Sequence, residues 1–176
     1  MAQVEDFQVP EGYEQLLKSN NGRYHKGGWN HYGPGYFELD ADTGVLTSHG
    51  GMGLFWYSVR EFGDFVLELD FLCADENTNS GVFLRVPGVP TSDDYIYHSF
   101  EIQIYDAGEG IHVTGAAYDA EAPTHSMWFG KWRSNACLNR PIFENLSLLS
   151  MMISLDLGFF SLRYIAIWQA RSYGPG

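Results

Sequence analysis

The stretch DFVLELDFLC, residues 64–73, alternates apolar and polar side chains. Because successive side chains of a β-strand point to opposite faces, this alternation gathers the apolar residues on one face. A strand with one apolar and one largely polar face is typical of a sheet that is covered by core on one side only. The apolar face comprises Phe65, Leu67, Leu69 and Phe71, and the opposite face comprises Val66, Glu68 and Asp70.

Similar short runs recur along residues 36–106, separated by glycine and other turn-forming residues. A composition with 16% aromatic residues and 20 glycines also suits strands joined by tight turns. The sequence therefore predicts an all-β antiparallel sandwich, in which only EGYEQLLKS, residues 11–19, resembles a helix. The predicted strands are YFELD (36–40), GVLTS (44–48), GLFWYS (53–58), DFVLELDFLC (64–73), GVFLRV (81–86) and SFEIQIYD (99–106).

The size and charge of the chain limit its partners. A chain of 176 residues fits one domain with a sizeable core. The formal net charge of -12 opposes binding to nucleic-acid phosphates and to anionic lipid headgroups. The first residues lack the basic and apolar regions of a secretory signal, which predicts a cytoplasmic location. Cys73 and Cys137 have no metal-ligand spacing and are expected to be buried thiols.

The end of the chain differs in character. Residues 146–168 are almost continuously apolar, and only Asp156 and Arg163 are charged. A charge near the centre of a bilayer costs about 2.5 to 3.5 kcal/mol on the insertion scale, which disfavours a membrane span. The alternatives are a buried element and an atypical tail.

Four blocks together resemble the 3-keto-disaccharide hydrolase family, over about residues 11–126. These are the segment from GYFELD to LELDF (35–71), NSGVFLRV (79–86), FEIQIYD (100–106) and TGAAYDAEAPT (114–124). The resemblance implies a jelly roll of the concanavalin A-like lectin/glucanase type. It also implies cleavage of glycosides whose sugar carries a ketone at carbon 3, by hydrolases or by related lyases and hydratases. It leaves an extracytoplasmic location open.

The resemblance weakens after residue 126. The family continues through a Gly-Glu-Trp-Asn segment and later an Asn-Gly turn, whereas this chain has GKWRSNACLNRPIFENLSLL, residues 130–149. We therefore expect a jelly-roll domain over residues 11–135 and an atypical segment over residues 136–176. A frame-shifted or truncated end would explain that segment, and it would leave the sandwich incomplete and the protein an inactive fragment.

The implied chemistry needs a base and a stabiliser of negative charge. A ketone at carbon 3 acidifies the hydrogen at carbon 2, and loss of that proton allows the substituent at carbon 1 to leave. A carboxylate can be the base, and a guanidinium can stabilise the charge that develops on the ketone oxygen. We predict Glu101 and Arg85 in these roles, since strand alternation places Glu101 with Gln103 and Arg85 with Phe83. An exposed Glu101–Arg85 ion pair is the structural alternative.

The predicted substrate contacts are mostly polar residues of the same blocks. All but Gln103 have a structural alternative: a turn for Asp106, Asn79 and Ser80, a buried structural role for the tyrosine, and a surface or structural position for the histidines. The six histidines have no helical zinc-motif spacing, so no cofactor is assigned, although a divalent metal stays an open alternative. The expected ligand is a sugar or glycoside, and the rival function is a non-catalytic carbohydrate-binding module. The predicted contacts are Gln103, Asp106, Asn79, Ser80, Tyr118, His98 and His49.

Overall fold

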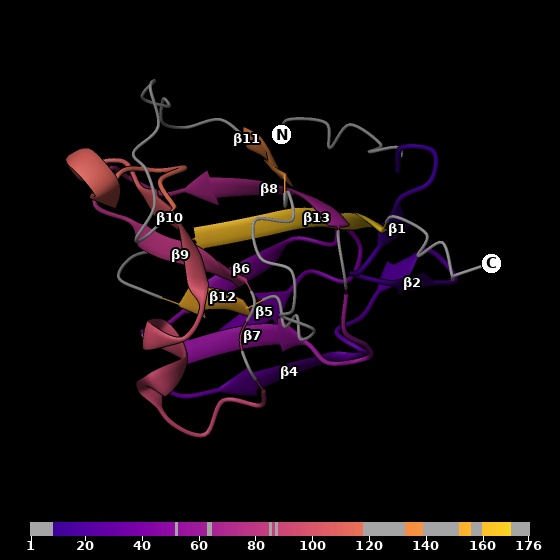
Figure 1. The fold of residues 1–176 in the computed structure, drawn as a ribbon. Coiled ribbons are helices and arrows are strands. Elements are labelled where there is room, and N and C mark those ends of the chain that lie inside the picture. The colour runs from indigo at the N-terminus through magenta and orange to yellow at the C-terminus, as the bar shows by residue number, and fades with distance from the viewer. Residues whose placement is uncertain are drawn as a thin grey trace.

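A computed structural model shows two antiparallel β-sheets packed face to face (Figure 1). Among the residues that the structure describes, the larger sheet has six strands and the smaller has five, and a short hairpin lies apart from both. The predicted all-β jelly-roll sandwich is thereby confirmed. The structure describes residues 9–51, 53–62, 65–84, 86, 88–117, 133–138, 152–155 and 160–169.

In the six-stranded sheet the order is β11-β8-β13-β6-β5, and β1 also pairs with β13. In the five-stranded sheet the order is β10-β9-β12-β7-β4. The first sheet contains β1 (Glu14–Gln15), β5 (Tyr36–Leu39), β6 (Leu46–His49), β8 (Phe65–Cys73), β11 (Arg133–Leu138) and β13 (Phe160–Gln169). The second contains β4 (Trp29–Tyr32), β7 (Gly53–Tyr57), β9 (Asn79–Leu84), β10 (Phe100–Tyr105) and β12 (Met152–Leu155). The remaining elements are the hairpin β2 (Ser19–Asn20) and β3 (Arg23–Tyr24) and the 3-10 turns η1 (Asp93–Tyr97) and η2 (Gly110–His112).

All six predicted strands form, and β8 shows why the alternation was informative. Its apolar face is buried in the core between the two sheets, as predicted. The opposite face is less simple, because Asp70 is also buried, at 2% exposure, and lies opposite Arg163 in the β8–β13 register. The predicted burial of Cys73 is confirmed, while the side chain of Cys137 lies outside the described residues.

The helix expected over residues 11–19 does not form. Glu14 and Gln15 instead pair with β13, and Leu16 and Leu17 are both fully buried. An isolated helix of fewer than about 12 residues is marginal in water, so pairing with a long strand wins over the local helical pattern.

The apolar run of residues 146–168 supplies strands to both sheets. β12 lies between β9 and β7, and β13 lies between β8 and β6. The strands of the atypical segment are thus interior members of the sandwich that was expected to end near residue 135. No helix within the described ranges is long and apolar enough to cross a membrane.

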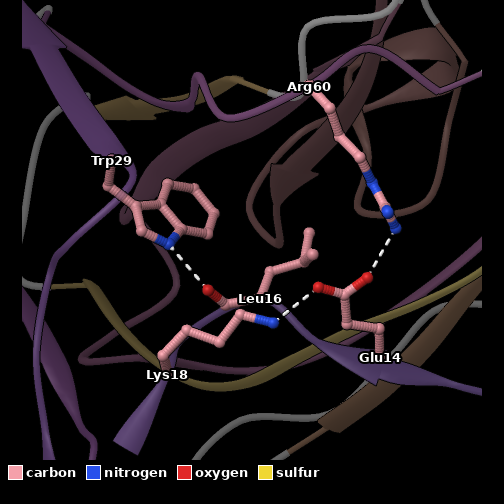
Figure 2. A network of polar contacts seen from close by, with 5 residues as sticks. All are labelled: Glu14, Leu16, Lys18, Trp29 and Arg60. Atoms are coloured by element: carbon pink, nitrogen blue, oxygen red, sulfur yellow. Dashed lines mark hydrogen bonds and ion pairs between the residues drawn. The ribbon is translucent and has the colours of Figure 1, made fainter.

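The N-terminal segment is held to the sandwich by the polar contacts of Figure 2. In Figure 2 the indole Nε1 of Trp29 donates to the carbonyl oxygen of Leu16 at 3.1 Å. The Leu16 amide also donates to the carbonyl oxygen of Ile165 at 2.7 Å. Glu14 receives Lys18 Nζ on one carboxylate oxygen and Arg60 on the other, each at 2.5 Å. Backbone pairing, an indole contact and two ion pairs therefore fix this segment beside β13.

Candidate functional site

The two faces of the five-stranded sheet have different surroundings. Its inner face meets the six-stranded sheet and contributes Phe55, Val82 and Ile104 to the main core. The outer face carries a second apolar cluster, made of Leu54, Trp56, Phe83 and Val86, with Tyr32 partly buried against it. Since neighbouring residues of a strand point to opposite faces, Phe83 of β9 must face away from Val82.

The register of β9 and β10 brings the predicted polar face to this outer surface. Glu101 lies opposite Phe83, and Gln103 lies opposite Gly81. Alternation predicted that Glu101 and Gln103 share a face, and because cross-strand partners point to the same face, the register adds Phe83 to it. The strands β9 and β10 lie side by side at one edge of the sheet (Figure 1).

Glu101 is half-buried and its side chain extends over the backbone of β9. The position that a Cβ would occupy on Gly81 is 2.9 Å from both Cγ and Cδ of Glu101, and Oε1 is closer still. Glu101 and Gly81 are diagonal neighbours across the two strands, a separation that a long side chain can bridge. The carboxylate therefore rests on a main-chain surface that only glycine leaves open.

Gln103 is buried, with 5% exposure, and it makes hydrogen bonds to backbone groups. Its Oε1 accepts a hydrogen bond from the Ile104 amide at 3.0 Å. The main chain of Gln103 also donates to Ala116 and accepts from Gly115, each at 2.8 Å. The segment that follows η2 thus covers the edge of β10 and leaves Gln103 little exposed surface for a ligand.

Asp106 and Asn79 lie where β10 ends and β9 begins. The hydroxyl of Thr114 donates to Asp106 Oδ1 at 2.6 Å. Asn79 is half-buried and lies opposite Tyr105 in the register, so it belongs to the same outer face as Glu101 and Gln103. The structure thus gathers Glu101, Gln103 and Asn79 on one face, with Asp106 at its end.

Three other predicted contacts lie elsewhere. Ser80 is fully buried, and its place in β9 puts it on the inner face with Val82, because only alternate residues reach the outer face. His49 belongs to β6 of the other sheet, where its Nε2 is 3.1 Å from Glu38 and its ring stacks on Tyr36. His98 is exposed in the connection between η1 and β10.

The sequence did not predict the second apolar cluster. In the predicted strand over residues 81–86, alternation would put Val86 on the same face as Val82 and Leu84, but Val86 packs with Phe83 instead. Val86 is not part of a strand, so strand alternation does not apply to it. The bulky residues Trp56 and Phe83 could have indicated this cluster. They alternate with core residues in their strands, so they lie on the outer face and need apolar neighbours there. Arg85 and Tyr118 lie outside the described residues.

A divalent metal was left open by the sequence. Among the side chains that the structure describes, no three from His, Cys, Asp and Glu gather closely enough to hold a metal ion.

Comparison with known proteins identifies relatives of this fold and sequence. A family described as the 3-keto-alpha-glucoside-1,2-lyase-like domain matches residues 13–140. This match continues beyond residue 126, where the resemblance seen in the sequence motifs weakened. No curated protein sequence matches the chain. A crystal structure from Parabacteroides distasonis ATCC 8503, assigned provisionally as a glycosyl hydrolase, has 20% identity and a TM-score of 0.67, covering 90% of this chain and 99% of its own. A second structure from the same strain, with the same provisional assignment, has 15% identity and a TM-score of 0.72, covering 91% and 94%. At these identities the two structures show the shared fold.

Proposed function

Because this chain belongs to the 3-keto-alpha-glucoside-1,2-lyase-like domain family, we propose that it cleaves glycosides whose sugar carries a ketone at carbon 3. The observation that supports this proposal is the place of Glu101. Glu101 is half-buried on the outer face of the five-stranded sheet, where it lies opposite Phe83 in the register and its carboxylate extends over Gly81. A carboxylate that is partly removed from water and still accessible is suited to act as a base.

The proposed reaction begins with proton transfer to Glu101. The ketone withdraws electrons from the bond between carbon 2 and its hydrogen, and the carboxylate removes that proton. The electron pair forms an enolate, which returns to the ketone as a double bond forms between carbons 1 and 2. The bond from carbon 1 to its oxygen substituent breaks, and the leaving oxygen takes up a proton. Addition of water across the new double bond would complete a hydrolysis.

The enolate needs a positive or hydrogen-bonding partner near the ketone oxygen. The sequence assigns this role to Arg85, which follows directly after the last residue of β9. A guanidinium presents a planar pair of donors that matches adjacent oxygens. Arg85→Lys keeps the charge but loses that fork, and we expect it to lower turnover.

Turnover of a 3-keto-α-glucoside, compared with that of the unoxidised glucoside, tests the proposal. We expect release of the substituent from the keto sugar alone, because the proton at carbon 2 is not acidic without the ketone. Equal turnover of both sugars would indicate ordinary glycosidase chemistry with paired carboxylates. Binding of the sugars without turnover would favour a carbohydrate-binding module. Repeating the assay with a chelator tests whether a divalent metal takes part.

Glu101→Gln tests the role of the carboxylate itself. The amide keeps the shape and hydrogen-bonding capacity of the side chain but cannot accept the proton. A positioned base contributes about 100- to 10,000-fold to rate, so we expect a loss on that scale with sugar binding retained. Glu38→Gln is a matched control, since Glu38 is an exposed carboxylate on the opposite sheet. Near-normal turnover in Glu101→Gln would place the base elsewhere.

A further inference from the structure

Gly81 occupies an unusual position for a glycine. It lies within β9, which has β10 on one side and β12 on the other. Glycine weakens a strand interior, because it packs no side chain and loses more backbone entropy on folding than other residues. Its backbone does not have a positive φ, so the conformation at this position does not require glycine. The reason for glycine at position 81 must therefore be space.

The space is filled by Glu101. A Cβ on Gly81 would lie 2.9 Å from Cγ and Cδ of Glu101, where ordinary contact begins at 3.4 Å. Three consecutive atoms of one side chain, Cγ, Cδ and Oε1, are its nearest neighbours. The contact therefore involves the Cγ methylene of Glu101 as well as its carboxylate.

We propose that Gly81 is a positioning residue for Glu101, because the missing side chain lets the carboxylate lie against the backbone of β9. The catalytic meaning of this contact rests on the proposed function. A glutamate side chain has three rotatable bonds, and a base must be held within about 0.5 Å of its productive place. Contact with the rigid main chain of an interior strand removes part of that freedom.

Gly81→Ala tests the proposal without altering any ionisable group. The added methyl group would displace the Glu101 carboxylate, and a misplacement of about 1 Å can lower turnover by about 100-fold. We expect kcat to fall by roughly this factor while KM changes little, since the base acts on the proton rather than on binding. Because a flexible side chain can move aside, the variant should fold, and a urea midpoint close to that of the parent protein would show this.

A double variant shows whether the effect passes through Glu101. In the Glu101→Gln background the base is already lost, so adding Gly81→Ala should cause no further loss of turnover. If Gly81→Ala lowers the remaining turnover by the same factor as in the parent protein, it acts by another route and the proposal is wrong. Non-additivity of this kind is expected of residues that act as a unit.

A measurement without substrate separates this proposal from the proposed function. The Glu101 carboxyl carbon can be followed by NMR, with its resonance assigned from its loss in Glu101→Gln. We expect Gly81→Ala to shift this resonance and its titration midpoint, while the resonance of Glu38 on the other sheet stays in place. An unchanged Glu101 resonance and titration would overturn the positioning role. Absence of turnover in the parent protein would contradict the proposed function, and the NMR result would still decide the role of Gly81.

Discussion

Thr114 donates a hydrogen bond of 2.6 Å from its hydroxyl to Asp106 Oδ1. The Thr114 amide also donates to the carbonyl oxygen of Tyr105 at 3.1 Å, and the side chain of Thr114 is buried. Asp106 thus joins the end of β10 to the segment that returns beside it. A carboxylate has two oxygens and can accept several hydrogen bonds, so a sugar contact by Asp106 stays a prediction alongside this structural contact.

Replacing Thr114 by valine should lower the free energy of unfolding by about 1 kcal/mol. Valine has nearly the same shape as threonine but lacks the hydroxyl that donates the hydrogen bond. Urea denaturation of the variant and the parent protein measures the difference. Thr114→Ser, which keeps the hydroxyl, is the control and should recover most of the loss. Equal stability of Thr114→Val and the parent protein would show that this hydrogen bond contributes nothing.

Ser80→Ala should lower stability and leave sugar turnover unchanged. Ser80 is fully buried on the inner face of β9, on the side away from Glu101. Loss of a buried hydroxyl partner costs about 1 to 3 kcal/mol when the remaining group stays unsatisfied. Steady-state kinetics and urea denaturation of the same preparation separate the two effects. A raised KM at unchanged stability would restore the sequence-based expectation that Ser80 contacts substrate.

Because Glu14 forms ion pairs, we expect part of the free energy of unfolding to depend on pH. Its pKa is lowered chiefly by the hydrogen bond from Lys18, with burial opposing the shift and the charges of Lys18 and Arg60 adding to it. A carboxyl group with a lower pKa in the folded state stabilises the fold above its unfolded pKa, near 4.3. This contribution is lost as the pH falls through the lower folded pKa. Because the side chains are more than a third exposed, solvent screening keeps it below about 1 kcal/mol.

Glu14→Gln tests this dependence. The variant should be less stable than the parent protein at pH 7, and the difference should shrink at pH 3 and in high salt. Urea denaturation at the two pH values measures it, with the exposed Glu61→Gln as the control. A difference that persists unchanged at pH 3 would assign the effect to packing rather than to charge.

Trp29→Phe should destabilise the N-terminal segment. The change removes the Nε1 hydrogen bond to the buried Leu16 carbonyl, while a ring is kept against Phe55, on which Trp29 stacks at 4.8 Å. An unsatisfied buried carbonyl costs about 1 to 3 kcal/mol. Faster hydrogen exchange at the Leu16 amide, which pairs with Ile165, would localise the loss. Unchanged exchange there would show that the indole contact does not hold this segment.

Local sequence patterns were enough to predict most strands of the sandwich and which of their side chains face the core. The alternation of Phe65 to Phe71 predicted the buried face of β8, and the runs along residues 36–106 predicted six strands. Alternation also predicted that Glu101 and Gln103 share one face of their strand. These predictions succeed because the direction of a side chain on a strand depends only on local backbone geometry.

Which strands pair, and which residues lie opposite one another across them, could be learned from the folded structure alone. Pairing joins residues far apart in the chain, so no local pattern shows that β12 and β13 complete both sheets or that His49 lies on the sheet opposite Glu101. The ladder of β9 and β10 likewise sets Glu101 over Gly81, a contact between residues 20 positions apart in the sequence. Helical patterns such as residues 11–19 give way for the same reason, because pairing with a long strand stabilises more than a single local turn.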